Sequence, residues 1–232
     1  MTQLNIGTRW RQFEGKALYA YHRLITQTAR WQFIGKANLT QARASGRPIL
    51  WTMWHGQVMP FIMYGDRFEN ASRFSIITVG DERSDSLIAL GEQIGAKMHA
   101  VDMQGNPVTA GRSVLRVIRA MNKGYDTMLA PDGPDGPAYE PKRGVAVLAQ
   151  KSAAAIVPIG AWTRQAYQRK RWDGYLIPGP FARIHMAFGP PIFAEADTPT
   201  DNLLDLISSA LHQAMNQARA AAGVISPAIN AK

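Results

Sequence analysis

The feature that most constrains the fold is an alternation of two patterns along the middle and end of the chain. Short, apolar and often β-branched runs, which are typical of buried strands, occupy 48–54, 74–79, 96–101, 126–130, 154–161 and 183–189. Helical periodicity occupies 84–94, 108–123, 144–152 and 201–221. Strands that alternate with helices predict an α/β fold with a mostly parallel central sheet flanked by helices.

The N-terminal part of the chain has a different pattern. Residues 8–31 carry apolar and aromatic side chains, Trp10 among them, at spacings of three and four, with basic residues between them. This predicts an N-terminal amphipathic helix, which could pack on the domain or lie in a membrane interface with its rings at headgroup depth. We therefore divide the chain into a helical segment over 1–34, an α/β domain over 35–222 and a loose tail over 223–232.

The charge of the chain favours anionic partners, because its formal net charge is +9. Nucleic acid, anionic lipid surfaces, phosphorylated substrates and acidic carrier proteins all fit that charge. The chain has no cysteine, which excludes thiol nucleophiles and cysteine metal sites. No two histidines have the spacing of a zinc site. No apolar run is long enough for a membrane span, and the N-terminus lacks the apolar stretch of a signal peptide. We expect a cytoplasmic protein, which could also lie on the surface of a membrane.

His55 is the most interesting titratable residue, because ligands of open α/β sheets bind at the carboxyl ends of strands. His55 and Gly56 follow the first predicted strand of the domain. A histidine can accept a proton from a hydroxyl near neutral pH. The alternative is a strand-end histidine bonded to a backbone carbonyl. Asp85 belongs to a charged cluster over 81–85, where an acid could orient the histidine or cap the following helix.

A stiff loop follows the fourth predicted strand. The stretch 128–144 contains two Asp-Gly pairs and four prolines, and prolines fix the backbone. Its turns could aim N–H groups at an anion, next to a helix N-terminus. The alternative is a rigid crossover whose aspartates cap turns. The candidate phosphate-binding residues are Asp132, Gly133, Pro134, Gly136, Lys142, Arg143 and Gly144.

The stretch 162–175 alternates aromatic with basic side chains. An anionic bilayer attracts such a segment by about 1 kcal/mol per nearby basic side chain, and an acidic carrier protein would be attracted as well. A solvated loop with internal cation–π pairs is the alternative. The candidate surface residues, with Trp10, are Arg164, Arg169, Lys170, Arg171 and Trp172.

Four blocks in one order carry a resemblance to a known family. They are "WHG" at 54–56, "APDGPDGP" at 130–137, "KRGVAVLAQKSAAAIVPIG" at 142–160 and "RWDGYLIPGPFARIHMAFGPPI" at 171–192. The chain resembles the lysophospholipid acyltransferase superfamily, in particular a bacterial branch related to lipid A secondary acyltransferases. The resemblance covers roughly residues 30 to 192. It implies a glycerolipid acyltransferase-like fold and transfer of a fatty acyl group to a lipid hydroxyl. The donor would be a thioester, acyl-coenzyme A or acyl carrier protein, with no bound cofactor.

The resemblance also implies roles for particular residues. In the superfamily a histidine is the base, and His55 matches it. The usual acid five residues later is absent, because Pro60 stands there. The branch's polar segment S-x-[SH]-x-D-G reads D-E-R-S-D-S at 81–86, where Asp85 alone fits, so Asp85 is the expected orienting acid.

A later block of the family is also altered. Its R-G-S-S element retains Gly111, Arg112 and Ser113, and we expect Arg112 and Ser113 at the substrate phosphate. In the following loop, Asp135 stands where the family has an arginine.

The leading hypothesis is an acyltransferase on the cytoplasmic face of the inner membrane that acts on a phosphorylated lipid acceptor. The departures at residue 60, 81–86 and 102–113 motivate an alternative, a catalytically impaired lipid- or acyl-chain-binding protein on the same fold. A third hypothesis, nucleic-acid binding through the basic surface, has no recognition motif behind it.

Overall fold

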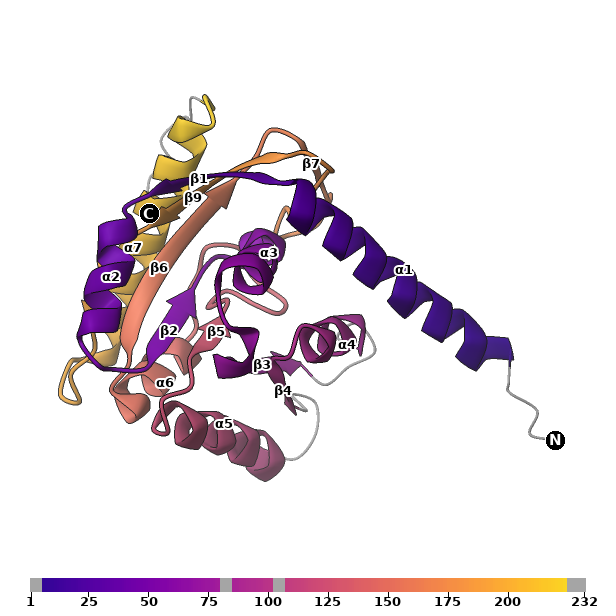
Figure 1. The fold of residues 1–232 in the computed structure, drawn as a ribbon. Coiled ribbons are helices and arrows are strands. Elements are labelled where there is room, and N and C mark those ends of the chain that lie inside the picture. Colours follow the sequence, from indigo (N-terminus) through magenta and orange to yellow (C-terminus); the bar gives the residue numbers. More distant parts are fainter. Residues whose placement is uncertain (1–5, 80–84, 102–106, 225–232) are drawn as a thin grey trace.

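The computed structural model describes residues 6–79, 85–101 and 107–224 (Figure 1). Its main sheet has the strand order β1-β9-β6-β2-β5, and β10 pairs with β6. The bounds of these strands are β1 Arg30–Ile34, β2 Ile49–Thr52, β5 Thr127–Leu129, β6 Ala155–Trp162, β9 Arg183–Phe188 and β10 Ile192–Phe193. The pairs β1–β9, β2–β5 and β2–β6 are parallel, whereas β6–β9 and β6–β10 are antiparallel.

Two shorter pairs of strands complete the β structure of the described residues. β3 (Ser75–Val79) and β4 (Lys97–Val101) form a parallel pair, and an isolated bridge from Phe74 to Asp126 places β3 beside β5. β7 (Ala166–Gln168) and β8 (Leu176–Pro178) form an antiparallel hairpin. The predicted α/β class with a mostly parallel central sheet is confirmed.

Helices cover both faces of the main sheet. Figure 1 draws α3 in front of the sheet and α7 behind it, and α7 packs along β6 and β9. The helices are α1 Ile6–Thr28, α2 Lys36–Ala44, α3 Val58–Phe68, α4 Asp85–Gln93, α5 Pro107–Met121, α6 Gly144–Ser152 and α7 Thr200–Ala221, with 3-10 turns η1 His55–Gln57 and η2 Ala71–Arg73. Gly160 lets α7 approach β6 closely, because a Cβ there would collide with the carbonyl of Ala214. The buried side chains on the two faces form separate clusters, one around Trp51 and Phe61 and the other around Leu148 and Ile207.

The N-terminal helix ends earlier than the periodicity predicts. α1 stops at Thr28, and Trp31, the last residue of the apolar pattern, lies in the edge strand β1. The N–H of Arg30 donates to the carbonyl of Ala182, 2.9 Å away. This pairing next to β9 stabilises a strand at residues where the helical spacing predicted a helix. Pairing with a distant strand leaves no local signal, so the sequence analysis missed β1. It also missed α2, α3 and the β7–β8 hairpin.

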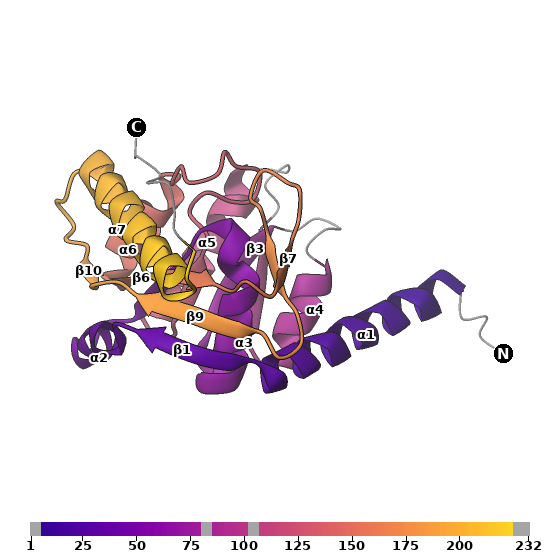
Figure 2. The ribbon, with the colours of Figure 1, turned by 90° about the horizontal axis from the view of Figure 1, so that it is seen from above.

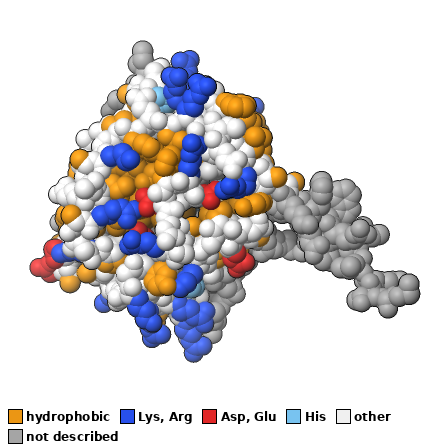
Figure 3. All heavy atoms as spheres, viewed as in Figure 1, with side chains coloured by type: hydrophobic (Ala, Val, Ile, Leu, Met, Phe, Trp, Pro, Cys, Tyr) orange, Lys and Arg blue, Asp and Glu red, His pale blue; other side chains and the backbone are white. Residues whose placement is uncertain are grey.

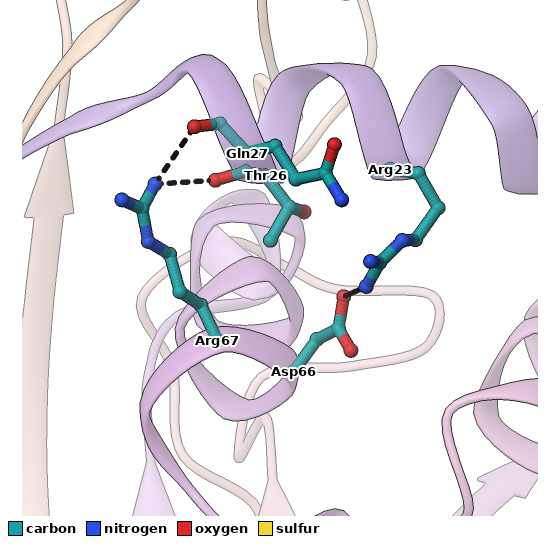
Figure 4. Close-up of a pocket in the computed structure, with 5 residues that line it drawn as sticks. All are labelled: Arg23, Thr26, Gln27, Asp66 and Arg67. Carbon is teal, nitrogen blue, oxygen red and sulfur yellow. Dashed lines mark hydrogen bonds and ion pairs between the residues drawn. The ribbon is translucent and has the colours of Figure 1, made fainter.

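α1 contacts both α3 and α4; its C-terminal end is anchored on the domain, and its N-terminal end extends away from it (Figures 1 and 2). Arg67 closes the anchored end by donating from Nη1 to the carbonyls of Thr26, Gln27 and Ala29, at 2.7, 3.2 and 3.0 Å (Figure 4 shows the first two). Beside it lies an open hollow of about 300 Å³ between α1 and α3. Its cations are already engaged, because Arg23 pairs with Asp66 at 3.5 Å. Among the described helices, none has both the length and the apolar character needed to cross a membrane.

A buried histidine at this junction predicts acid sensitivity. His22 is fully buried and lies 3.0 Å from Asp66. Burial lowers the pKa of His22 below its ordinary 6.5, although Asp66 opposes the shift. The unfolded chain therefore binds the proton more tightly, so stability is complete above about pH 6.5 and falls as the pH drops below it. We expect His22→Gln to reduce this acid-induced loss, by up to about 1.4 kcal/mol per pH unit. Urea unfolding at pH 7.5, 6.5 and 5.5 measures it, and parallel curves for the two proteins would contradict the prediction.

Candidate active site

The site is built around His55, which follows β2 and opens the turn η1. Its backbone N–H donates to Oδ1 of Asp132, 2.9 Å away. Its side chain retains 25 % of its exposure, so the ring is partly open to solvent. β2 and β5 are parallel neighbours, so their carboxyl ends place His55 and Asp132 side by side, as the sheet argument predicts.

Asp132 braces the loop that follows β5. Its residue exposure is 1 %, and its second oxygen, Oδ2, accepts the N–H of Tyr139 at 3.2 Å. Burial raises the pKa of Asp132, and the N–H groups of His55 and Tyr139 oppose that shift. Both carboxyl oxygens accept backbone hydrogen bonds. Asp132 therefore ties the loop to the histidine, which is the turn-capping role of the alternative interpretation.

A second carboxylate holds the imidazole itself. Oδ2 of Asp173 lies 2.8 Å from Nδ1 of His55, and the Asp173 side chain is fully buried. Its other oxygen accepts the N–H of Tyr175 at 3.3 Å and lies 3.8 Å from Nε of Arg171. A carboxylate at Nδ1 favours the tautomer that carries its proton there, which leaves the lone pair on Nε2. A histidine held in this way can act as a general base.

Aromatic rings border the imidazole. The ring centroids of Trp172 and Tyr175 lie 5.3 and 5.9 Å from that of His55. Burial raises the pKa of Tyr175, and the charge of Asp173 raises it further, so Tyr175 remains a neutral phenol at physiological pH. The rings reduce access of water to the His55–Asp173 pair, and low polarity strengthens such a hydrogen bond.

Three glycines allow the loops around His55 to meet. A Cβ on Gly56 would overlap the carbonyl oxygen of Asp173. A Cβ on Gly133 would lie 2.8 Å from Cδ2 of His55, and one on Gly136 would lie 2.7 Å from the Trp172 ring. Gly136 also has a φ of 74°, which disfavours other residues. The glycines of the W-H-G and D-G-P-D-G-P sequences are therefore explained by close packing of the loops that carry His55, Asp173 and Trp172.

The structure pairs His55 with an acid that the sequence did not single out. Asp85 begins α4, and its side chain lies outside the described residues. In the described part of the chain the partner of Nδ1 is Asp173, 118 residues from His55. The available sequence signal was the Asp-Gly pair in "RWDGY". The loop after β5, which also packs on His55, contains two such Asp-Gly pairs.

The remaining phosphate-site candidates fall into three groups. Gly133, Pro134 and Gly136 lie in the loop that packs on His55. Lys142 and Gly144 are exposed, and exposed Arg143 pairs with Asp201 at 3.3 Å. Arg112 is exposed and Ser113 is buried on α5, which packs beside β3 and β4.

The surface candidates divide in a similar way. Arg164, Arg169, Lys170 and Arg171 are exposed on and beside the β7–β8 hairpin. Trp172 is instead half-buried over His55. The side chain of Trp10 lies outside the described residues. Within the described chain no three potential metal ligands gather.

Three of the other four histidines have a hydrogen-bond partner, and the fourth is buried in a strand. His22 bonds to Asp66, His99 to Ser75 at 2.8 Å, and Nδ1 of His212 to the carbonyl of Ser208 at 2.8 Å. His185 is buried in β9. We assign none of them to the site.

Comparisons with known proteins agree with this architecture. No protein-family model matches the chain. It is 26 % identical over 191 residues to uncharacterized protein RP090 of Rickettsia prowazekii, an alignment that covers 80 % of this chain and 83 % of that protein. The crystal structure of the 1-acyl-sn-glycerophosphate acyltransferase PlsC of Thermotoga maritima superposes with a TM-score of 0.58 at 13 % identity, over 94 % of this chain and 85 % of that one. The chain therefore has the fold of a PlsC-type acyltransferase.

Proposed function

We propose that the protein is an acyltransferase that moves a fatty acyl group from a thioester to a hydroxyl of a phosphorylated lipid. The observation that carries this proposal is the hydrogen bond of 2.8 Å between Nδ1 of His55 and the buried carboxylate of Asp173. It supplies an oriented base at the carboxyl end of β2, on the fold of a PlsC-type acyltransferase. Membership of the lysophospholipid acyltransferase superfamily is part of the proposal.

The chemistry follows from the free Nε2 of His55. The acceptor hydroxyl gives its proton to Nε2 as its oxygen attacks the thioester carbonyl carbon. The carbon–sulfur bond then breaks, and the thiolate leaves and takes the proton back from the imidazolium. Asp173 stabilises that imidazolium throughout. The acceptor gains an ester, and the donor is released as a free thiol.

The basic surface supports an anionic acceptor and donor. Lys142 lies exposed after the loop that packs on His55, and Arg169, Lys170 and Arg171 lie exposed next to Asp173 in sequence. Coenzyme A, acyl carrier protein and lipid phosphate are all anionic, and each would be attracted there. We place the protein on the cytoplasmic face of the inner membrane, where such donors and acceptors meet.

The alternative, a lipid- or acyl-chain-binding protein without activity, rests on the departures at 81–86 and 102–113 and on Pro60, which replaces the acid that the superfamily usually has. Asp173 weakens that argument, because it provides a carboxylate to the same histidine from another segment.

The test is conversion of a labelled thioester. Purified protein is mixed with membrane lipid extract and either labelled acyl-coenzyme A or labelled acyl carrier protein, with His55→Ala in parallel. We expect a labelled lipid from the wild-type protein and none from the variant. Binding of lipid without product from either donor would contradict the transferase and support the alternative.

A further inference from the structure

An aromatic patch lies on the face of the sheet that carries α3, and no part of the proposed chemistry uses it. The patch consists of Trp31 and Phe33 from the edge strand β1 and Phe68 from the end of α3. Their ring centroids lie 5.9 Å apart for Trp31 and Phe33, 5.5 Å for Trp31 and Phe68, and 5.2 Å for Phe33 and Phe68. Alternation along the strand places Trp31 and Phe33 on the same face.

The patch is partly open to solvent. Phe68 is 44 % exposed, and Trp31 and Phe33 are of intermediate exposure. Figure 3 shows hydrophobic side chains gathered between β1 and α3, bordered by Lys and Arg side chains. Trp31 and Phe33 also pack against the core, but aromatic rings that stay partly exposed within a basic border are typical of an interaction surface.

The charges around the patch are mainly positive. Nζ of Lys36 lies 4.9 Å from the centroid of Phe33, and the guanidinium of Arg67 lies 5.4 Å from that of Phe68. The two nearby carboxylates are each paired with a cation, Asp66 with Arg23 and Glu69 with Arg43. The border therefore presents net positive charge to a partner.

We propose that the aromatic patch docks the protein on an anionic lipid bilayer. Aromatic rings are favoured at the depth of lipid headgroups, where their apolar bodies and polar edges are both accommodated. Lysine and arginine side chains reach from there to anionic headgroups. This combination fits a bilayer surface better than it fits a soluble acidic protein, whose carboxylates would meet the cations and leave the three rings facing polar groups.

The docking proposal rests on the proposed function, because an enzyme that acts on a lipid must meet the bilayer. α3 connects the two sites: it begins directly after η1, which contains His55, and ends at Phe68. Its 11 residues span about 16 Å. A bilayer under the patch would therefore lie about one short helix from His55.

The test is co-sedimentation of the full chain with vesicles of phosphatidylglycerol and phosphatidylcholine. We expect preference for phosphatidylglycerol vesicles. Lys36→Glu should weaken that binding about thirtyfold, since reversal changes the charge by two units at about 1 kcal/mol each. Phe68→Ser should weaken it about tenfold, through loss of apolar contact.

Lys151→Glu and Leu206→Ser are the matched controls for these two changes. Both residues are exposed, and they lie on α6 and α7, far along the sequence from the patch. We expect neither variant to change vesicle binding by more than about twofold.

Two outcomes would overturn the docking proposal. One is wild-type binding by both Lys36→Glu and Phe68→Ser. The other is binding to acyl carrier protein, abolished by Lys36→Glu, without binding to vesicles. If Phe68→Ser melts at a lower temperature, the exposed Lys36 carries the test alone. His55→Ala should bind vesicles like the wild type, so loss of turnover and loss of docking are separate results.

Discussion

Replacement of Asp173 by asparagine is expected to lower the rate of acyl transfer by about 10²- to 10⁴-fold, the range of general-base catalysis. The buried carboxylate lies 2.8 Å from Nδ1 of His55. Asparagine keeps the size of the side chain but removes the charge that stabilises the imidazolium, and its amide can turn an N–H toward the ring. The step that suffers is proton transfer, so kcat should fall more than KM rises. Initial rates over pH 5.5 to 9 would measure the loss.

Three comparisons make this prediction specific. Asp197→Asn removes the charge of an exposed aspartate and should leave the rate unchanged. Asp173→Glu should retain more activity than Asp173→Asn. The double variant with His55→Ala should be no slower than His55→Ala alone, because the acid acts through the histidine. Full activity of Asp173→Asn would show that the hydrogen bond between Asp173 and His55 is structural rather than catalytic. Additive losses in the double variant would show that the two residues act independently.

Gly56→Ala is expected to cost about 10²-fold in rate with the fold intact. The added methyl group would overlap the carbonyl oxygen of Asp173, which is backbone and cannot turn aside. The segment that carries Asp173 must then move, and a displacement of about 1 Å in a catalytic group costs roughly this factor. Initial rates, together with a thermal melt, would measure the effect.

Gly65→Ala is the matched control for this change. Gly65 lies on α3, in the helix that follows Gly56, and a Cβ there would have no neighbour within 4 Å. Alanine in a helix stabilises by about 0.5–1 kcal/mol relative to glycine, so we expect full activity and a slightly higher melting temperature. Equal activity of Gly56→Ala and Gly65→Ala would mean that the Asp173 segment adapts without cost.

The sequence predicted the elements whose signal is local. The runs that became β2, β3, β4, β5, β6 and β9 are short and rich in apolar residues, and α6 was predicted at its observed bounds. His55 was recognisable because it follows a strand and precedes a glycine. The position of a residue after a strand is a property of the neighbouring sequence, and pattern reasoning can find it.

What the sequence did not predict depends on contacts between distant segments. Asp173 lies 118 residues from His55, in a hairpin whose strands have three residues each, too short to give a period. β1 was assigned to a helix because Trp31 continued the helical spacing, and only its pairing with β9 decides otherwise. Long-range pairing overrides local propensity in both cases.

Asp132 has a consequence for how the protein moves. One buried carboxylate accepts the backbone N–H groups of both His55 and Tyr139. If the loop after β5 opened, both amides would lose their acceptor together, and a buried charge would be left without partners, which is costly. The base and the loop therefore belong to one cooperative unit of local unfolding. The site is therefore expected to be either fully assembled or fully open. A state in which the loop is in place but His55 is displaced is disfavoured.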